Sequence, residues 1–429
     1  MTQIAKRIKS KLQGGSLQFV LFIGAVIAVL LLTFVLLAHS HFLFVKKTDK
    51  YVEMVKRTDY IIQQSLLGHL NSTSQKNELL EGNGISTQLT ESNWGIYDIL
   101  TVTSSFQKNS FRKTVLTGSR LLDTEATLFL KDNNRPMVVA GNASIVGDAY
   151  LPKQGIRMGN IGGQSFYASE PIQGRKYEST PSLPIMASKN SDALEKLLFG
   201  RTTKTPSPSI ALRGSEMVNS FSEPTIILDA DVLNLSGKKI SGNVVIRSSS
   251  QIQIDASTQL KDVILVAPYV RIGEGVVGNF QAIASKKIEV GQNCNLSYPS
   301  ALVVLDKAGG SAKKISNQAT QPQINIEKNS VVYGSLCYLG RSTEQTYYPQ
   351  IRITEGARIV GQVYCQKNVE LRGSVWGNVT TDGFVTLENG NVYQNHLFNG
   401  SMDISKLPQR FVGMSLGKEE KKGEVKWLY

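Results

Sequence analysis

Histidine and cysteine, which supply many metal ligands and catalytic groups, are scarce in this chain of 429 residues. There are four histidines and three cysteines. No Cys-x-x-Cys pair occurs, and no histidine lies near a cysteine in the sequence, so we predict no zinc site and no cofactor. We expect the cysteines to be small buried hydrophobic residues rather than disulfides. They are Cys294, Cys337 and Cys365.

Sequence signatures of catalysis are also missing. There is no glycine-rich phosphate loop and no nucleophile motif. Enzymes that cleave polysaccharides need clustered carboxylates on one face, whereas four glutamates here each follow a short apolar segment at a turn, where a solvated charge is ordinary. A cation held by these acids is the alternative. They are Glu274, Glu327, Glu355 and Glu388. We predict that the protein is not an enzyme.

The basic charge is not concentrated in one segment. The formal net charge of +13 is spread along the chain. Such a surface favours anionic neighbours, including lipid headgroups and an acidic cell-wall polymer. No run of lysine and arginine interleaved with aromatic residues occurs, so the sequence does not favour nucleic acid as a partner.

A long apolar run covers residues 17–45 and is interrupted only by a few polar residues. A helix needs about 20 apolar residues to cross a bilayer core, whereas a cleaved secretory signal has an apolar core of about 7–15 residues. We therefore predict a retained, single membrane span in contact with membrane lipid. Lysine and arginine flank both ends and do not decide the orientation, but a short basic tail before a long body favours a body outside the cytoplasm.

The helix is expected to continue past the membrane as far as residue 70. An apolar stripe follows the span at helical spacing and needs a partner, which is either the protein's own body or other subunits. We take the stripe as a candidate assembly surface. Its main residues are Tyr51, Val55, Ile62 and Leu66.

A short phrase recurs along the second half of the chain: apolar, any residue, apolar, then a polar or glycine turn. Copies begin about 18 residues apart, with one interval doubled and one stretched by loops at 306–323 and 340–350. This interval is typical of stacked repeats. It predicts a mainly β fold, a β-solenoid of about 18-residue coils behind one long transmembrane helix. The copies are Leu233–Leu235, Ile252–Ile254, Val270–Ile272, Ile288–Val290, Ile324–Ile326, Ile351–Ile353, Val369–Leu371 and Val385–Leu387.

Stacking makes predictions about single residues. The last residue of most phrases should point into one core, namely Ile254, Ile272, Val290, Ile326, Ile353 and Leu371. Neighbouring coils lie about 4.8 Å apart, so Arg271 should face Glu289, and Arg352 should face Glu370. Each such exposed pair contributes only a few tenths of a kcal/mol.

We divide the chain into six segments. These are a basic tail or leader (1–16), the helix (17–70), a connector (71–93), a β-rich intermediate region (94–224), the β-solenoid (225–395) and a cap or tail (396–429). The intermediate region should hold a short helix near 191–198 and a Pro/Ser linker at 202–209. Residues 138–150 resemble the later repeats, so the solenoid or a related sheet is expected to begin there.

The repeats resemble those of bactofilins, polymer-forming β-helix proteins of bacteria. The resemblance covers roughly residues 225–395 and implies end-to-end self-association without catalytic residues. The loops, the larger intermediate region and the charged tail depart from that family.

The amino terminus is similar in plan to type IV minor pilins and type II secretion pseudopilins, which have a short basic leader, a glycine before the cleavage point and a long apolar helix. The resemblance implies cleavage between Gly15 and Ser16 and lateral packing of helices with other subunits. Ser16 stands where a hydrophobic residue is usual, and Val20 where most pilins carry Glu.

We therefore expect a non-enzymatic structural protein of the bacterial inner membrane, with its head in the periplasm or at the cell surface. Its partners would be membrane lipid and either copies of itself or other pilin-like envelope subunits. The alternatives are a bactofilin-like scaffold on the cytoplasmic side, and an extracytoplasmic β-helix that binds or cleaves polysaccharide.

Overall fold

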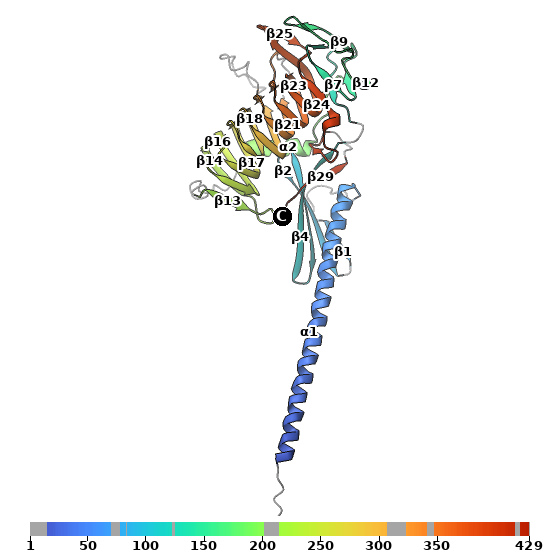
Figure 1. Ribbon diagram of the computed structural model, residues 1–429, viewed down its shortest axis with the longest axis vertical. Helices are drawn as coiled ribbons and strands as arrows, with labels where there is room; N and C mark the ends of the chain where they lie inside the picture. The colour runs from blue at the N-terminus through green and yellow to red at the C-terminus, as the bar shows by residue number, and fades with distance from the viewer. Residues whose placement is uncertain are drawn as a thin grey trace, which may run out of the picture.

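The computed structural model describes residues 15–69, 78–82, 84–121, 125–200, 214–306, 323–340, 347–416 and 421–428. One long helix, α1 (Gly15–Leu66), projects from a β-rich body (Figure 1). Residues 1–14, the Pro/Ser segment 202–209 and the greater part of the predicted loops at 306–323 and 340–350 lie outside the described residues.

The amino-terminal part of α1 is apolar and uncovered by protein. None of the most apolar 18-residue window is buried, and Phe34 and Leu37 are 69% and 68% exposed. Leaving apolar surface in water costs roughly 25 cal/mol per Å², so this surface requires an apolar environment. By length and composition α1 is a candidate membrane span. It ends at Leu66, before residue 70, because Gly68 adopts a φ of +77° that stops the helix.

An antiparallel sheet covers the other end of α1. Strands β1 (Glu78–Gly82), β2 (Ile85–Trp94), β3 (Tyr97–Phe106) and β4 (Asn109–Arg120) pair in chain order. Two strands from the carboxyl-terminal segment, β28 (Val412–Gly413) and β29 (Lys422–Leu428), both pair with β4. The end of the chain therefore completes this sheet, where we expected a cap or a tail.

Strands β1 and β2 fall in the segment that we expected to be a connector. In the first half of β2, buried and more exposed positions alternate, with Ile85, Thr87 and Leu89 buried. This is the pattern of a half-buried strand. Threonine at one of the buried positions weakened the apolar signal in the sequence.

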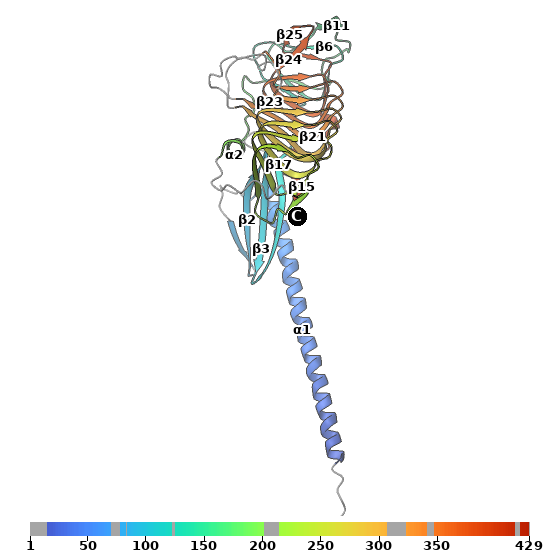
Figure 2. The same cartoon turned by 90° about the vertical axis from the view of Figure 1, so that its left-hand side faces the viewer.

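A second sheet forms most of the body, and its strands pair in parallel except for the short strand β25 (Asn391–Gln394) (Figure 2). We call it the parallel stack. The sheet closes on itself. Its main strands are β13 (Glu216–Asn219), β14 (Ile226–Asn234), β15 (Lys239–Gly242), β16 (Val244–Ile254), β17 (Gln259–Ile272), β18 (Val277–Val290), β19 (Asn295–Asp306), β20 (Ile324–Ile326), β21 (Val331–Gly340), β22 (Ile351–Ile353), β23 (Arg358–Leu371), β24 (Ser374–Glu388) and β27 (Ser401–Asp403).

The register of the parallel stack follows the repeat in the sequence. Ile252 pairs with Val270, and Val270 pairs with Ile288. Arg271 lies opposite Glu289, and Arg352 lies opposite Glu370, as predicted. All six residues predicted to point inwards are at most 3% exposed and share one hydrophobic cluster.

The ion pairs differ in burial from our expectation. Arg352 Nε donates to Glu370 at 2.9 Å, but the Glu370 side chain is only 4% exposed and also accepts from Arg372 at 3.1 Å. Arg271 has no ion pair among the described residues, since Glu289 contacts Lys287 at 2.5 Å instead. Stacking therefore sets the register, while local neighbours decide which pairs form.

Residues 128–178 extend the parallel stack at its far end. β5 (Leu128–Leu130) pairs with β24, β7 (Ser144–Val146) with β27, and β8 (Ala149–Leu151) joins β5 to β12 (Lys176–Glu178). We expected a related sheet to start near residue 138, and these strands do join the stack, but beyond its last strands rather than before its first. The remaining short elements are β6 (Met137–Ala140), β9 (Ile156–Met158), β10 (Asn160–Ile161), β11 (Gln164–Ser165), β25 (Asn391–Gln394), β26 (His396–Phe398) and a 3-10 helix at Ile404–Lys406.

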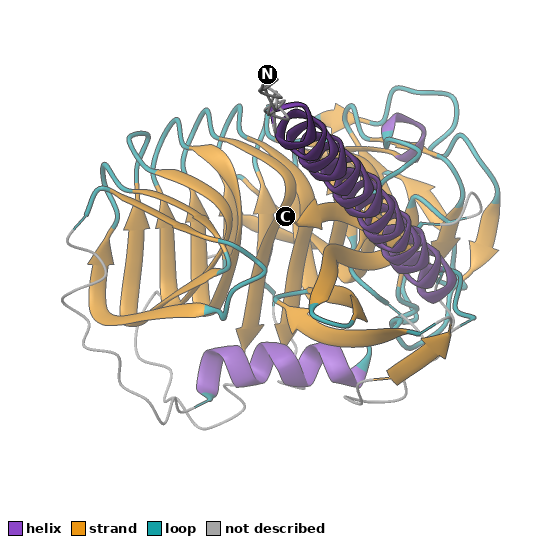
Figure 3. Ribbon diagram, turned by 90° about the horizontal axis from the view of Figure 1, so that it is seen from below, coloured by secondary structure: helices purple, strands orange, loops and turns teal. Residues whose placement is uncertain are grey.

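A second hydrophobic cluster joins the antiparallel sheet to the outside of the parallel stack. Helix α2 (Ser188–Phe199), predicted near 191–198, lies along the stack at this junction (Figure 3). Gln281 of β18 is 3% exposed; its Oε1 accepts from Ile96 N at 3.0 Å and its Nε2 donates to Trp94 O at 2.8 Å. One buried amide thus ties the two sheets together.

The three cysteines are buried and free. Burial raises the pKa of the Cys365 thiol to about 12 and also raises the pKa of Cys294 and Cys337. The thiols therefore stay protonated at neutral pH, and they pack as small hydrophobic residues.

Candidate binding cleft

The residues predicted for processing lie at the start of α1. Gly15 and Ser16 are its first two described residues, and both are exposed.

The predicted assembly stripe is divided between two environments. Ile62 is 2% exposed and packs on the antiparallel sheet, and Leu66 is partly buried beside it. Tyr51 is 48% exposed and meets Phe111 edge to face at 5.7 Å between ring centroids, while Val55 is half-buried. The protein's own body therefore covers the carboxyl-terminal half of the stripe.

The buried face of α1 is rotated from the predicted stripe. It consists of Met54, Thr58, Ile61, Ile62 and Ser65. Polar residues belong to it because Thr58 Oγ1 and Ser104 Oγ form a hydrogen bond of 2.8 Å inside the interface. Three apolar side chains on the other side of α1 stay at least 43% exposed, namely Val52, Tyr60 and Leu67.

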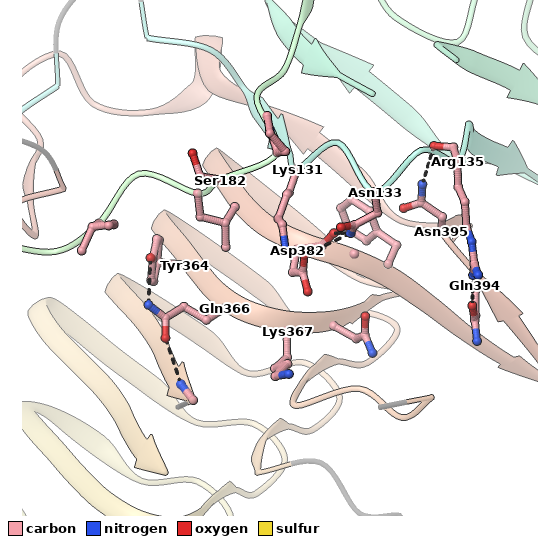
Figure 4. A pocket seen from close by; sticks show the side chains of 17 residues that line it. Lys131, Asn133, Arg135, Ser182, Tyr364, Gln366, Lys367, Asp382, Gln394 and Asn395 are labelled. Atoms are coloured by element: carbon pink, nitrogen blue, oxygen red, sulfur yellow. Dashed lines mark hydrogen bonds and ion pairs between the residues drawn. The ribbon is translucent and has the colours of Figure 1, made fainter. Parts of the chain in front are cut away.

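A cleft of about 720 Å³ lies between the last strands of the parallel stack and two segments of the intermediate region (Figure 4). The stack contributes β23, β24 and β25, and the other segments are residues 131–135 and 181–185. β24 and β25 are at the end of the body far from α1 (Figures 1 and 2). The cleft therefore forms where residues 131–135 and 181–185 lie against that end.

One wall of the cleft holds an ion pair. Lys131 Nζ lies 2.8 Å from Asp382 Oδ1. Asn133 Nδ2 donates to the backbone oxygen of Asp382 at 2.8 Å and to its Oδ1 at 3.0 Å. Asp382 is the one carboxylate among the lining residues, and its charge is already balanced by Lys131.

A second wall is built on β23. The Tyr364 hydroxyl donates to Pro184 O at 2.7 Å, and Gln366 Nε2 donates to the same hydroxyl at 3.3 Å. Gln366 Oε1 in turn accepts from Gly340 N at 3.0 Å. These bonds hold the 181–185 segment against the stack and fix this wall of the cleft.

The third side carries a guanidinium and a buried amide. Arg135 contacts Gln394 Oε1 through Nη1. Asn395 is 8% exposed; its Nδ2 donates to Arg135 O and Pro136 O at 3.2 and 3.1 Å, while its Oδ1 has no hydrogen-bond partner in the described part of the chain. Buried polar atoms without partners are uncommon, so Asn395 Oδ1 has an unused capacity to accept a hydrogen bond.

The lining has three cations, Lys131, Arg135 and Lys367, and one acid. Cleavage of a glycosidic bond by the usual route needs two carboxylates, and the lining supplies one. No group of three or more His, Cys, Asp or Glu residues suited to a metal occurs among the described residues.

Sequence reasoning did not find this cleft. Its walls come from segments some 250 positions apart, as in the bond between Asn133 and Asp382, and none of these residues belongs to a recognisable motif. No known protein family, curated protein or solved structure matches this chain.

Proposed function

We propose that this protein is a non-enzymatic structural subunit that α1 anchors in a bacterial inner membrane, with its body outside the cytoplasm. The observation that carries the proposal is the division of α1. One half is apolar and uncovered, and the other half is fixed to the body by a packed interface. A rigid connection of this kind serves a subunit whose body must be held at a set position relative to the membrane.

The parallel stack is interpreted as a β-solenoid. Its strands pair at the interval of the sequence repeat, and glycine occupies a tight corner between them. At Gly361 φ is +148°, and a Cβ would lie 1.9 Å from Gly334 O of the preceding layer. Only glycine fits such a corner without a shift of the backbone.

Assembly through α1 is the pilin-like part of the proposal. A helix that continues from an apolar half onto an antiparallel sheet is similar in plan to pilin subunits. The exposed residues Val52, Tyr60 and Leu67 leave apolar surface beside the membrane half for a neighbouring helix.

Electron microscopy of the purified protein tests this mode of assembly. The truncated variant lacks residues 1–45, which removes the apolar run but keeps the buried residues Met54, Ile61 and Ile62 of α1. Ordered assemblies of the full chain that disappear on this truncation support assembly through α1. Filaments formed equally well by the truncated protein would instead support a bactofilin-like scaffold that polymerises through the ends of the stack.

A further inference from the structure

We propose that anionic phospholipid headgroups bind in the angle between α1 and the tip of the β3–β4 hairpin, so that the body contacts the membrane surface at a second point beside its anchor. This inference rests on the proposed anchoring through α1 and adds the class of lipid that the anchored protein selects. It is drawn from the direction of the hairpin, its height above the apolar run, and the lysines that the two elements present.

The β3–β4 hairpin points towards the membrane half of α1 (Figures 1 and 2). Lys108 lies in the two-residue turn at its tip. Further up the hairpin, Ser104 forms a hydrogen bond of 2.8 Å with Thr58 of α1. Closer to the tip, the Phe106 ring lies 5.5 Å from the amine of Lys50, which is nearer the amino terminus of α1. β3 therefore runs antiparallel to α1, and its tip is the part of the hairpin closest to the apolar run.

The tip lies close to the expected level of the lipid headgroups. As a helix, the run of residues 17–45 is about 43 Å long, which matches the roughly 40–45 Å thickness of a bilayer with its headgroups. A centred run places Val45 at the outer edge of the headgroup layer. Lys50, which contacts the hairpin, lies about 7.5 Å further along the helix axis. The Debye length at physiological ionic strength is about 8 Å, so a charge at the tip is within range of charged headgroups.

Two lysines of α1 lie on the side of the helix that faces the hairpin. Lys47 comes seven residues before Met54, which belongs to the buried face, and seven residues are about two helical turns. Lys46 comes four residues, about one turn, before Lys50. Lys46 and Lys47 therefore lie on α1 between the hairpin tip and the membrane.

We call Lys46, Lys47 and Lys108 the juxtamembrane lysines. All three are exposed, and none of them forms an ion pair among the described residues. The amine of Lys46 lies over the Phe42 ring at 5.0 Å, a contact that leaves its charge in place. The three ammonium groups are therefore accessible to an anion from the membrane side.

The acids near the tip leave positive charge in excess. Glu53 pairs with Lys50 at 2.7 Å. Asp59 pairs with Lys113 at 2.6 Å. Asp49 is exposed and forms no ion pair in the described part of the chain, so it offsets one of the three juxtamembrane lysines. Lysine near an anionic membrane surface is attracted to it, and headgroups are the anions that anchoring itself brings to this height.

Electron spin resonance of spin-labelled lipids tests the proposal on the full chain reconstituted in phosphatidylcholine vesicles. Trace amounts of chain-labelled phosphatidylglycerol and phosphatidylcholine are compared, and the immobilised fraction of each gives the ratio of their association constants. We expect phosphatidylglycerol to be favoured about threefold, because the lysines attract it together. The preference should weaken in 1 M NaCl, where the Debye length falls to about 3 Å.

Lys108→Ala separates the hairpin from the helix, because Lys108 is the juxtamembrane lysine that the body contributes. This variant should lower the preference for phosphatidylglycerol by about half, and Lys108→Arg should keep it. Lys47→Ala should lower it to a similar extent. Lys153→Ala is the matched control, because Lys153 is an exposed cation between β8 and β9, at the far end of the body, and it should leave the preference unchanged. All four variants should keep the melting temperature of the unmodified protein.

Equal association of the two lipids with the unmodified protein would overturn the proposal. A preference that Lys108→Ala leaves unchanged would also overturn it, because α1 alone would then select the lipid. Replacement of chloride by inorganic phosphate at the same ionic strength should leave the preference intact, and its loss would indicate a site for free phosphate instead. Immobilised phosphatidylcholine reports contact of α1 with lipid independently, so a missing preference leaves the proposed anchoring standing. Absence of any immobilised lipid would contradict both.

Discussion

Single side chains in the parallel stack alternate between core and surface, and this alternation gives the sharpest residue-level prediction. Val290 is 1% exposed, whereas its neighbour Glu289 has a side chain 43% exposed. Val290→Asp would bury an unpaired charge and should cost several kcal/mol. Glu289→Gln should change stability by less than about 1 kcal/mol. Chemical denaturation of both variants checks this, and similar losses of stability would show that the inward and outward assignments are wrong.

The buried carboxylate of Glu370 makes Arg352 more important than an exposed cation. Arg352→Ala removes one of the two arginines that pair with a side chain only 4% exposed. Loss of a partner of a buried charge should cost about 2 kcal/mol or more. Arg271→Ala, at the equivalent position of another layer, should cost under about 1 kcal/mol because Arg271 is exposed. Equal effects in thermal unfolding would mean that Glu370 is solvated in solution.

At this scale the sequence predicted most of what the structure shows about the repeats. A period of two within strands and about 18 between layers determines which side chains are buried and which lie opposite each other. The burial of Glu370 was not predicted; its carboxylate pairs with Arg372 as well as with Arg352. The cleft residues carried no periodic signal, and their proximity depends on contacts between distant segments.

Among the elements, Gln281 supplies two of the hydrogen bonds that join the two sheets. Gln281→Ala would leave Ile96 N and Trp94 O without their present partners inside a buried interface, at a cost of roughly 1–3 kcal/mol for each group. We expect the antiparallel sheet to exchange amide hydrogens faster while the inner strands of the stack stay protected. Gln253→Ala, on the exposed side of β16, is the control. Unchanged exchange at β2 and β3 would show that Gln281 does not hold the junction.

The amino-terminal end of α1 carries the prediction about processing. If this protein is handled as a pilin-like subunit, a leader peptidase should remove the residues up to Gly15, and the mature chain should begin at Ser16. Mass spectrometry of protein recovered from its native host measures this directly. An intact Met1 or Thr2 would exclude processed-pilin assembly and leave a plain signal anchor.

The helix and the strands were unequally predictable as elements. The apolar run predicted α1 because a membrane span is defined by composition alone. The stripe expected on α1 ran through Thr58 and Ile62, and both are buried, but the buried face also includes Met54, Ile61 and Ser65 and is rotated from the expected stripe. The pairing of β29 with β4 joins residues some 300 positions apart, and no local pattern predicts such a contact.

At the scale of the whole molecule, the body and the candidate membrane span occupy opposite ends of a long particle (Figure 1). Orientation in the membrane decides whether the body meets envelope polymers or the cytoplasm. The positive-inside rule does not decide this orientation, because basic residues flank both ends of the apolar run. The proposed anchoring and the pilin-like assembly both require the body to be outside.

A reporter enzyme that is active only outside the cytoplasm, fused after Tyr429, tests this orientation most directly. β29 ends one residue before the fusion point, so the reporter will lie on the same side of the membrane as the body. We expect the fusion to be active in cells, and the body to be digested by protease added to spheroplasts. An inactive reporter together with a protease-protected body would place the body in the cytoplasm, and would contradict the proposed function in favour of a cytoplasmic scaffold.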